Sequence, residues 1–374
     1  MVADRRLRAS GFDRLRVLLV APPMLPVPPH SYAGTERVVA AIGAELHRRG
    51  HSVALVAPGD SDVAYEHIPS VGQSLWSAAA TDDPAGDTAS AAMERTIEVA
   101  TRAAHRFDLV HAHIEAHGFA LAERCPVPVI STLHGRLDAP GLPELLERNR
   151  SVPLVAVSHS QRRFFPDQRW VATIHNGLPL AGMPFRELPG DYLAFVGRVT
   201  AEKGIREALE LSRLTGIRLR AAAKVFSDAE HRHFDEVVRP AIDAGELEFL
   251  GEVGPEERDP LYAGALATLM LGGWPEPFGL VAIESMATGT PVIARRAGAL
   301  TETIEHGVTG FLVDDLGEAV LAVERVGGLD RRAIRERTLE RFSPARMVDA
   351  YEEAYRSVLA GPGRPAQAAR HGRS

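Results

Sequence analysis

Two glutamates, Glu276 and Glu284, stand in the run Trp-Pro-Glu-Pro-Phe-Gly-Leu-Val-Ala-Ile-Glu that begins at Trp274. We expect a strand to end near Leu271 and a helix to begin near Gly279, so Glu276 lies in the loop before the helix and Glu284 more than one turn inside it. Carboxylates accept hydrogen bonds from sugar hydroxyls, and the free N–H groups of a helix start suit a phosphate. The spacing therefore suits a nucleotide-sugar, with one glutamate for the ribose and one for a hexose. Taken singly, Glu276 could be only a charge at a helix start, and Glu284 a residue on a solvated helix face.

Two cationic residues, Arg198 and Lys203, follow the apolar strand that begins at Tyr192 and precede a helix that begins at Ile205. A guanidinium can hold phosphate oxygens bidentately and a lysine acts as a point charge, so two such groups converging from one loop predict a diphosphate clamp. The loop is not a Walker A sequence, and the chain contains no G-x-G-x-x-G fingerprint. The alternative interpretation is a solvated basic turn.

A glycine, Gly34, stands at the first expected strand–helix junction, just before a helix for which Thr35 is the expected N-cap. A residue without a side chain lets the backbone approach a phosphate closely. A plain capping turn would explain the same two residues.

Histidines gather at the ends of two expected strands. His111 and His113 alternate along one strand, so their side chains point the same way, and His117 follows His113 by four residues. This spacing resembles a metal site, but no cluster of carboxylates or thiols completes it, so we do not expect zinc. His134 comes directly after the next strand, where an imidazole over a cleft could hydrogen-bond a sugar hydroxyl or could be a purely structural residue.

Short apolar runs alternate with helical segments along the chain, which predicts parallel sheets with helices on both faces. A connector rich in proline and glycine at 178–190 separates two such series. We therefore expect an α/β protein of two doubly wound, Rossmann-like domains that face each other across a cleft, with ligands beyond the carboxyl ends of the strands. The expected strands are 15–21, 52–57, 109–112, 127–133, 153–157 and 171–174, then 192–196, 218–222, 248–250, 267–271, 291–294 and 311–313.

The expected organisation is a flexible arm at 1–14, an N-terminal domain at 15–180 and a C-terminal domain at 181–342. Ser343 and Pro344 are expected to begin a last helix that spans 343–360, and a disordered tail follows at 361–374. Residues 77–92 are expected to form a variable surface segment that leads into a helix near 91–106.

The composition limits the function further. A length of 374 residues suggests two domains, and an apolar content of 45% is that of a globular protein. The single cysteine, Cys125, excludes a disulfide framework and a four-thiolate zinc site and fits a reducing compartment. A net charge of -7 argues against a nucleic-acid binder with a broad basic face. We expect neither a spanning helix nor a signal peptide, hence a cytoplasmic protein. Four arginines could form a basic face for a weak peripheral contact with the inner membrane face or for an anionic acceptor, or could lie on solvated helix faces: Arg148, Arg150, Arg162 and Arg163.

Three segments together resemble glycosyltransferase family 4, whose members are retaining, nucleotide-sugar-dependent enzymes of GT-B fold. They are the Glu-Pro-Phe-Gly-Leu-Val run with the second glutamate that follows it, the loop from Gly197 to Gly204 that holds the arginine and the lysine, and the Ala-Gly-Thr-Glu-Arg-Val turn from Ala33. The resemblance spans residues 15–359 and is more specific in the C-terminal half. Ala33 stands where members commonly have a second glycine, and its methyl group could narrow the access of a phosphate.

The resemblance implies a role for each of these residues. Arg198 and Lys203 would neutralise the donor diphosphate as it leaves, Glu276 would hold hexose hydroxyls and His134 would meet the transferred sugar near its 6-hydroxyl; these four are the expected catalytic residues. The expected donor-binding residues are Gly34 at the phosphates, Val253 at the base, Gly279 and Leu280 through their backbone, Phe278, and Glu284 at the ribose. The last helix would cross back onto the N-terminal domain.

The function implied is transfer of a hexosyl group from a nucleotide-diphosphate sugar, expected to be a UDP- or GDP-sugar, to a hydroxyl of a glycan, a lipid or a small-molecule glycoside. Attack from the front face would retain the anomeric configuration, and neither a metal nor another cofactor is expected. No motif encodes the acceptor, the donor base or the oligomeric state. Two alternatives remain, a GT-B nucleotide-sugar epimerase and a non-catalytic nucleotide-sugar-binding protein; neither would release a nucleotide diphosphate in an acceptor-dependent way.

Overall fold

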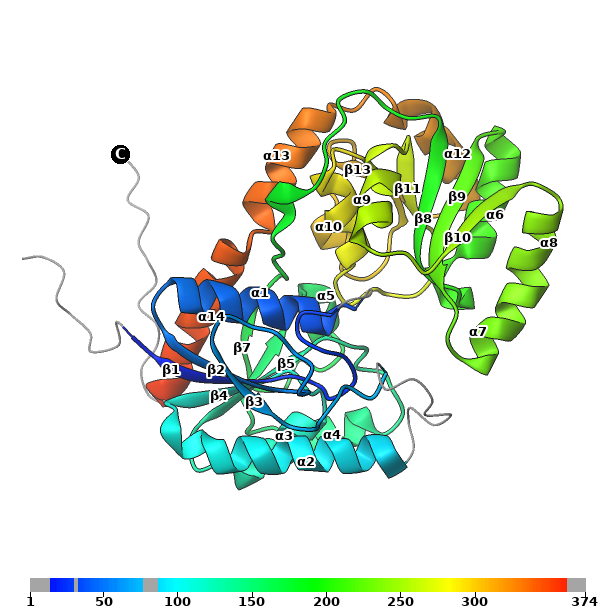
Figure 1. Ribbon diagram of the computed structural model, residues 1–374. Coiled ribbons are helices and arrows are strands. Elements are labelled where there is room, and N and C mark those ends of the chain that lie inside the picture. Colours follow the sequence, from blue (N-terminus) through cyan, green and yellow to red (C-terminus); the bar gives the residue numbers. More distant parts are fainter. Residues whose placement is uncertain (1–13, 30–32, 77–86, 362–374) are drawn as a thin grey trace, which may run out of the picture.

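The computed structural model describes residues 14–29, 33–76 and 87–361, which form two α/β domains that face each other (Figure 1). The N-terminal domain contains a seven-stranded sheet in the order β3-β2-β1-β4-β5-β6-β7, and the C-terminal domain a six-stranded sheet in the order β10-β9-β8-β11-β12-β13. All strand pairs within the two sheets are parallel. The expectation of two doubly wound domains is confirmed.

The strands are short and mostly buried. Those of the N-terminal domain are β1 (Arg16–Val20), β2 (Ser52–Ala57), β3 (Glu66–Pro69), β4 (Leu109–Ala112), β5 (Val129–Leu133), β6 (Leu154–Ala156) and β7 (Trp170–Thr173). Those of the C-terminal domain are β8 (Tyr192–Arg198), β9 (Arg218–Lys224), β10 (Leu247–Gly251), β11 (Ala267–Met270), β12 (Val292–Arg295) and β13 (Gly310–Val313).

Helices cover both faces of each sheet. They are α1 (Thr35–Arg48), α2 (Asp87–Ala103), α3 (His117–Arg124), α4 (Leu142–Arg148), α5 (His159–Arg162), α6 (Ile205–Thr215), α7 (Asp228–His233), α8 (Arg239–Asp243), α9 (Pro255–Ala263), α10 (Leu280–Ala287), α11 (Leu300–Thr303), α12 (Leu316–Val326), α13 (Arg331–Arg341) and α14 (Pro344–Leu359). Among the described residues, no helix is long and apolar enough to cross a membrane.

The apolar strand β1 shows why this sequence makes a sheet buried on both sides. Its side chains alternate between faces, so Val17 and Leu19 join one apolar cluster while Leu18 and Val20 join another. In Figure 1, α1 and α2 lie on opposite sides of this sheet. A continuous apolar run is therefore required here, where a sheet exposed on one face would show alternation.

The last helix, α14, lies against the N-terminal domain, where it packs on α1 and β7 (Figure 1). Ser343 caps it, accepting a hydrogen bond from the backbone N–H of Arg346 at 3.3 Å. The two segments that connect the domains run side by side at this point, since the N–H of Leu178 donates to the carbonyl oxygen of Phe342 at 3.0 Å. The N-terminal domain is thus completed by the C-terminal end of the chain.

Three local expectations differ from the structure. The N-cap of α1 is Gly34 and not Thr35, and no side chain caps this helix. Strand β3 was not expected because it is a half-buried edge strand with Ile68 as its one buried-type aliphatic residue. Helix α2 begins at Asp87, ahead of the expected start near residue 91. Most of the expected arm, of the expected variable segment and of the expected tail lies outside the described residues.

Candidate active site

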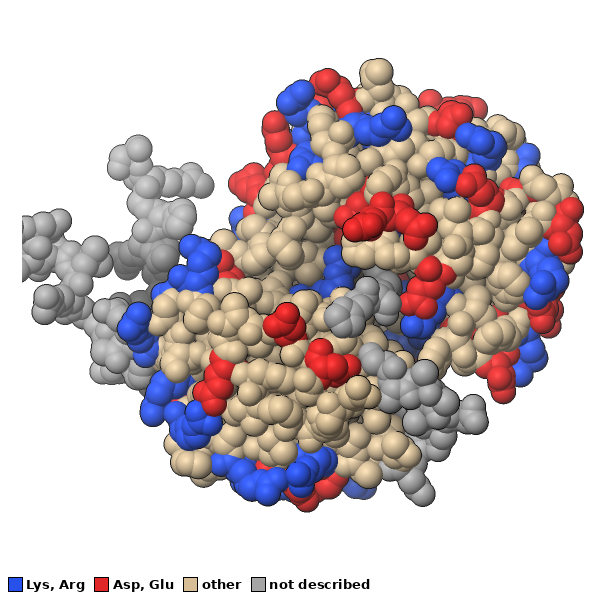
Figure 2. Space-filling model, in the orientation of Figure 1, with Lys and Arg blue, Asp and Glu red and all other residues tan. Residues whose placement is uncertain are grey.

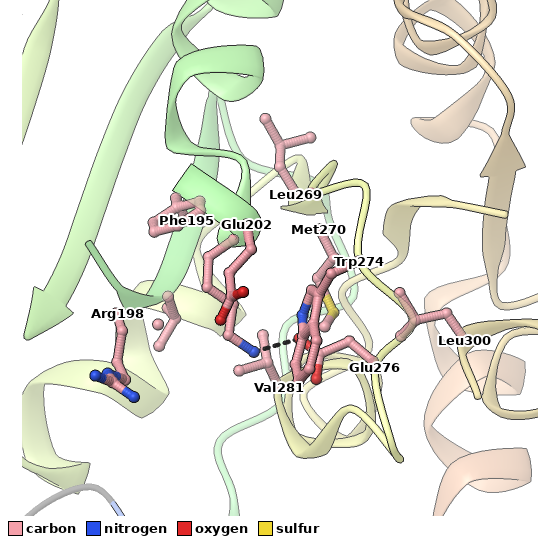
Figure 3. Close-up of a pocket in the computed structure, with 13 residues that line it drawn as sticks. Phe195, Arg198, Glu202, Leu269, Met270, Trp274, Glu276, Val281 and Leu300 are labelled. Carbon is pink, nitrogen blue, oxygen red and sulfur yellow. Dashed lines mark hydrogen bonds and ion pairs between the residues drawn. The ribbon is translucent and has the colours of Figure 1, made fainter. Parts of the chain in front are cut away.

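A cavity of about 590 Å³ opens at the carboxyl ends of β8 and β11 (Figure 3). These neighbouring strands flank the point where the winding of the C-terminal sheet reverses, the usual place for a ligand in such a sheet. Arg198, Lys203, Trp274 and Glu276 line the cavity together with apolar side chains. In Figure 2 the two domains meet along a hollow, with acidic and basic side chains interspersed on the face shown.

Two glycines bring the loops after β8 and β11 into direct contact. A Cβ atom on Gly204 would lie 2.3 Å from the backbone nitrogen of Gly272, and a Cβ on Gly272 would lie 1.9 Å from the carbonyl oxygen of Glu202. Since neither position tolerates a side chain, the backbones can pack this closely only with glycine at both. The contact places Lys203 beside the loop that carries Glu276.

Lys203 and Glu276 form an ion pair inside the cavity, and Lys203 Nζ donates to Glu276 Oε1. The lysine also lies 4.8 Å from the ring centroid of Trp274. The Glu276 loop is fixed from behind, because the N–H of Ala299 donates to the Glu276 carbonyl oxygen at 2.9 Å. The cavity therefore holds a cation that could bind a diphosphate, and beside it a carboxylate that could accept hydrogen bonds from sugar hydroxyls.

Arg198 lines the same cavity but does not converge with Lys203, contrary to the expectation. Its guanidinium pairs with Glu230, whose side chain is 2% exposed and also accepts the N–H of Phe226 at 2.7 Å. Figure 3 shows this guanidinium pointing away from Glu276. The ion pair offsets the cost of burying the Glu230 carboxylate, which accounts for the direction of the Arg198 side chain in this conformation.

Glu284 is fully buried and lies at the contact between the domains, not on a solvated face. It pairs with Arg37 of α1, lies 3.6 Å from Nη1 of Arg258, and accepts the hydroxyl of Tyr262 at 3.2 Å. The Arg37–Glu284 pair joins the N-terminal domain to α10. In this conformation Arg37 binds Oε1 of Glu284, and the Tyr262 hydroxyl donates to Oε2.

The remaining expected donor residues lie in different parts of the domain contact and the C-terminal domain. Gly34 faces Leu280 across the domain contact, since a Cβ on Gly34 would lie 3.5 Å from Leu280 Cδ1. Gly279 is the N-cap of α10 with φ +87° and without a capping side chain, so the start of this helix presents backbone N–H groups. Val253 lines a separate cavity of about 1370 Å³ with Arg37 and Arg258.

Phe278 does not project into the cavity. Its side chain is 3% exposed and packs against His175 and Phe342, with ring centroids 5.7 and 5.9 Å away. The structure therefore gives the Phe278 side chain a packing role near the domain connection, because an apolar ring there completes the core.

His134 follows β5 on the N-terminal side of the cleft, and burial lowers its pKa to about 4. The backbone N–H groups of His134 and Gly135 both donate to Glu115 Oε1, at 2.9 and 3.1 Å. Burial raises the pKa of Glu115 to about 7. Gly135 and Glu276 line one small pocket of about 260 Å³, so the His134 turn faces the loop of the other domain that carries Glu276.

His111 and His113 point the same way, as expected, and both are fully buried at the end of β4. His111 bonds to the hydroxyls of Tyr355 and Thr132, and His113 bonds to His134. Within the described ranges, no group of three or more His, Cys, Asp or Glu residues could hold a metal ion.

Family profiles match both halves of the chain. The profile described as Glycosyltransferase Family 4 matches residues 32–182, and the profile described as Glycosyl transferases group 1 matches residues 186–326. The chain belongs to the GT-B glycosyltransferases of group 1 and family 4.

Relatives and solved structures agree with this assignment. The glycosyltransferase is 29% identical over 309 residues to a glycogen synthase of Mycobacterium tuberculosis, a match that covers 72% of this chain and 74% of the relative. Its structure is similar to that of AviGT4, a glycosyltransferase involved in avilamycin A biosynthesis, with 26% identity, a TM-score of 0.68, and 93% and 99% of the two chains covered. Anabaena Alr3699/HepE in complex with UDP-glucose shares the fold, with 17% identity, a TM-score of 0.70, and 92% and 100% covered.

Sequence reasoning missed several residues of the glycosyltransferase that surround these groups. Trp274 contacts both Lys203 and Arg136 of the other domain, and the guanidinium carbon of Arg136 lies 4.8 Å from the ring centroid. Arg37 and Glu115 were missed because their partners lie far along the chain. For two of them the signal was position, since Trp274 follows β11 and Glu115 follows β4, at the carboxyl ends of strands, whereas Arg37 lies in the first turn of α1.

Proposed function

We propose that this glycosyltransferase moves a hexosyl group from a nucleotide-diphosphate sugar to an acceptor hydroxyl with retention of the anomeric configuration. One observation carries the proposal: Lys203 and Glu276 are held together in a cavity at the carboxyl ends of β8 and β11, facing the His134 turn of the other domain. A diphosphate would take the lysine, and sugar hydroxyls would take the glutamate. The similar structure that contains UDP-glucose and the similar glycogen synthase support a nucleotide-sugar donor.

The chain's positive groups drive the reaction in this proposal. As the bond between the sugar and the diphosphate breaks, negative charge grows on the leaving oxygen, and Lys203 and the N–H groups at the start of α10 stabilise it. Arg198 joins them when the diphosphate replaces Glu230 as its partner. The leaving phosphate oxygen takes the proton of the attacking hydroxyl. We propose that no metal ion is needed, because these groups supply the positive charge at the diphosphate.

The donor can be identified by thermal-shift measurements with UDP, GDP, ADP, TDP and their sugar nucleotides, with and without EDTA. We expect a selective rise in melting temperature for a UDP- or GDP-sugar that persists with EDTA. Loss of the rise with EDTA would overturn the metal-independent mechanism. No rise with any nucleotide would overturn the proposed donor site.

The stereochemistry can be read with the donor so found. Slow transfer to water releases the free sugar, and proton NMR taken before mutarotation shows its first anomer. We expect the anomer of the donor, since front-face attack keeps the configuration. The opposite anomer would contradict retention.

Substitution of Glu284 tests the ribose site. We expect Glu284→Gln to weaken binding of the nucleotide diphosphate by about 10-fold or more, because hydrogen bonds to charged groups contribute roughly 1.5–3 kcal/mol. Calorimetry measures the affinity, and Glu246→Gln, on an exposed ion pair with Arg213, is the matched control. Unchanged affinity in Glu284→Gln would remove the residue from the nucleotide site.

A further inference from the structure

Two of the histidines at the end of β4 have no role in the function proposed above, although they adjoin a residue that has one. His111 is satisfied at both ring nitrogens, with Nδ1 2.8 Å from the Tyr355 hydroxyl and Nε2 2.7 Å from the Thr132 hydroxyl. Its ring packs against that of His113, with centroids 3.9 Å apart. The ring of His113 therefore packs against the ring of His111, which two hydrogen bonds hold in place, and this contact restricts rotation of the His113 ring.

The imidazole ring of His113 makes one hydrogen bond, to His134. Its Nδ1 lies 2.9 Å from Nε2 of His134, while its own Nε2 is buried and has no hydrogen-bond partner within the described part of the chain. Burial lowers the pKa of His113 well below its ordinary value and that of His134 to about 4. At neutral pH each ring is therefore uncharged and carries one N–H.

Only two arrangements of these protons make the hydrogen bond. If His134 donates, His113 must carry its own proton on Nε2, which leaves a buried N–H without an acceptor. If His113 donates from Nδ1, its Nε2 is left with an unused lone pair. Buried donors without partners are rarer in proteins than under-used acceptors, so the geometry favours donation from His113 to His134.

We propose that His113 is a positioning residue that holds His134 in the tautomer protonated at Nδ1. His134 Nε2 then accepts from His113, and the Nδ1–H of His134 is available as a donor. Glu115 completes the arrangement, because it binds the backbone N–H groups of His134 and Gly135. This role rests on the proposed function and on the contact with the transferred sugar that the family resemblance implies for His134. His134 is then a hydrogen-bond donor to a hydroxyl oxygen of that sugar.

The tautomer can be observed in the ligand-free protein. Two-bond proton–nitrogen NMR of the full chain labelled with ¹⁵N-histidine distinguishes Nδ1 from Nε2, and the His134 signals are those that vanish in His134→Asn. We expect Nδ1 of His134 to carry the proton and Nε2 to be bare. A proton on Nε2 of His134 would overturn the proposal, whatever the activity of the protein.

Variants of His113 test its effect on turnover. His113→Phe keeps a ring of similar shape but cannot donate, whereas His113→Asn keeps an amide N–H near the position of Nδ1. We expect His113→Phe to mix the two His134 tautomers and to lower kcat about 10-fold, the effect of one hydrogen bond. Affinity for the nucleotide diphosphate should not change, and His113→Asn should restore most of kcat.

The control is His117→Ala, an exposed histidine of α3 close in sequence, which should behave as the unmodified protein. Equal losses in the Phe and Asn variants, or an unchanged His134 tautomer in His113→Phe, would refute the positioning role. If His113→Phe fails to fold, the tautomer of the unmodified protein and the Asn variant decide. Full activity in His134→Ala would instead contradict the proposed function, since the tautomer measurement is independent of catalysis.

Discussion

Replacing Lys203 with alanine is expected to lower turnover by about 10²–10³-fold, the loss usual for one preorganised group that stabilises developing negative charge. Lys203 is the cation that the structure places in the cavity beside Glu276 and Trp274. In the proposed reaction, the negative charge of the departing diphosphate develops beside this ammonium. Release of the nucleotide diphosphate from the donor, followed over time, measures the effect on kcat.

Two comparisons make this result specific. Arg198→Ala is expected to cost less, about 10-fold, because its guanidinium is committed to Glu230 before the donor binds. Arg213→Ala on α6, which breaks an exposed ion pair with Glu246, should leave turnover unchanged. Full turnover in Lys203→Ala would refute the assignment of this residue to the diphosphate.

The fold could be predicted from the sequence because its strands are buried on both faces. Such strands are short, continuous apolar runs, and every strand expected from such a run is present within a few residues of its expected position. Strand β3 was not predicted because an edge strand needs few apolar residues, and Glu66–Pro69 has only one large aliphatic side chain. The cap of α1 was not predicted. A cap at Thr35 would start the helix at Glu36, whereas the helix begins at Thr35 with Gly34 as its N-cap.

The proximity of Lys203 and Glu276 was predictable from the sequence, but the partners of the other charged side chains were not. The loops that carry Lys203 and Glu276 each follow a strand at the same edge of one sheet, so their proximity follows from topology. The partners of Arg198 and Glu284 did not follow, because Glu230 and Arg37 are remote in sequence and no local spacing links them. Short-range patterns show which side chains a strand end presents, and only the packing of the two domains shows which charge neutralises which.

The second large effect is expected at Glu276, the ion-pair partner of Lys203. Glu276→Gln should lower kcat/KM for the donor by about 100-fold while leaving the affinity for the free nucleotide diphosphate within about 2-fold. A carboxylate that accepts two sugar hydroxyls contributes roughly 1.5–3 kcal/mol for each hydrogen bond, and the amide retains part of this. The nucleotide diphosphate lacks the hexose, so calorimetry with it should not sense the change.

The same pair of measurements separates the two glutamates. Glu284→Gln should weaken the nucleotide diphosphate itself, whereas Glu276→Gln should be silent with that ligand and costly with the complete donor. The ion pair of Glu276 with Lys203 adds one further requirement. The amide of the Gln variant cannot neutralise the ammonium of Lys203, so the lysine would be freer to bind the diphosphate. Any change in the affinity for the nucleotide diphosphate should therefore be a slight increase. If Glu276→Gln weakened the binding of the nucleotide diphosphate and of the complete donor equally, Glu276 would contact the nucleotide and not the sugar. That result would contradict the assignment of Glu276 to the hexose and Glu284 to the ribose.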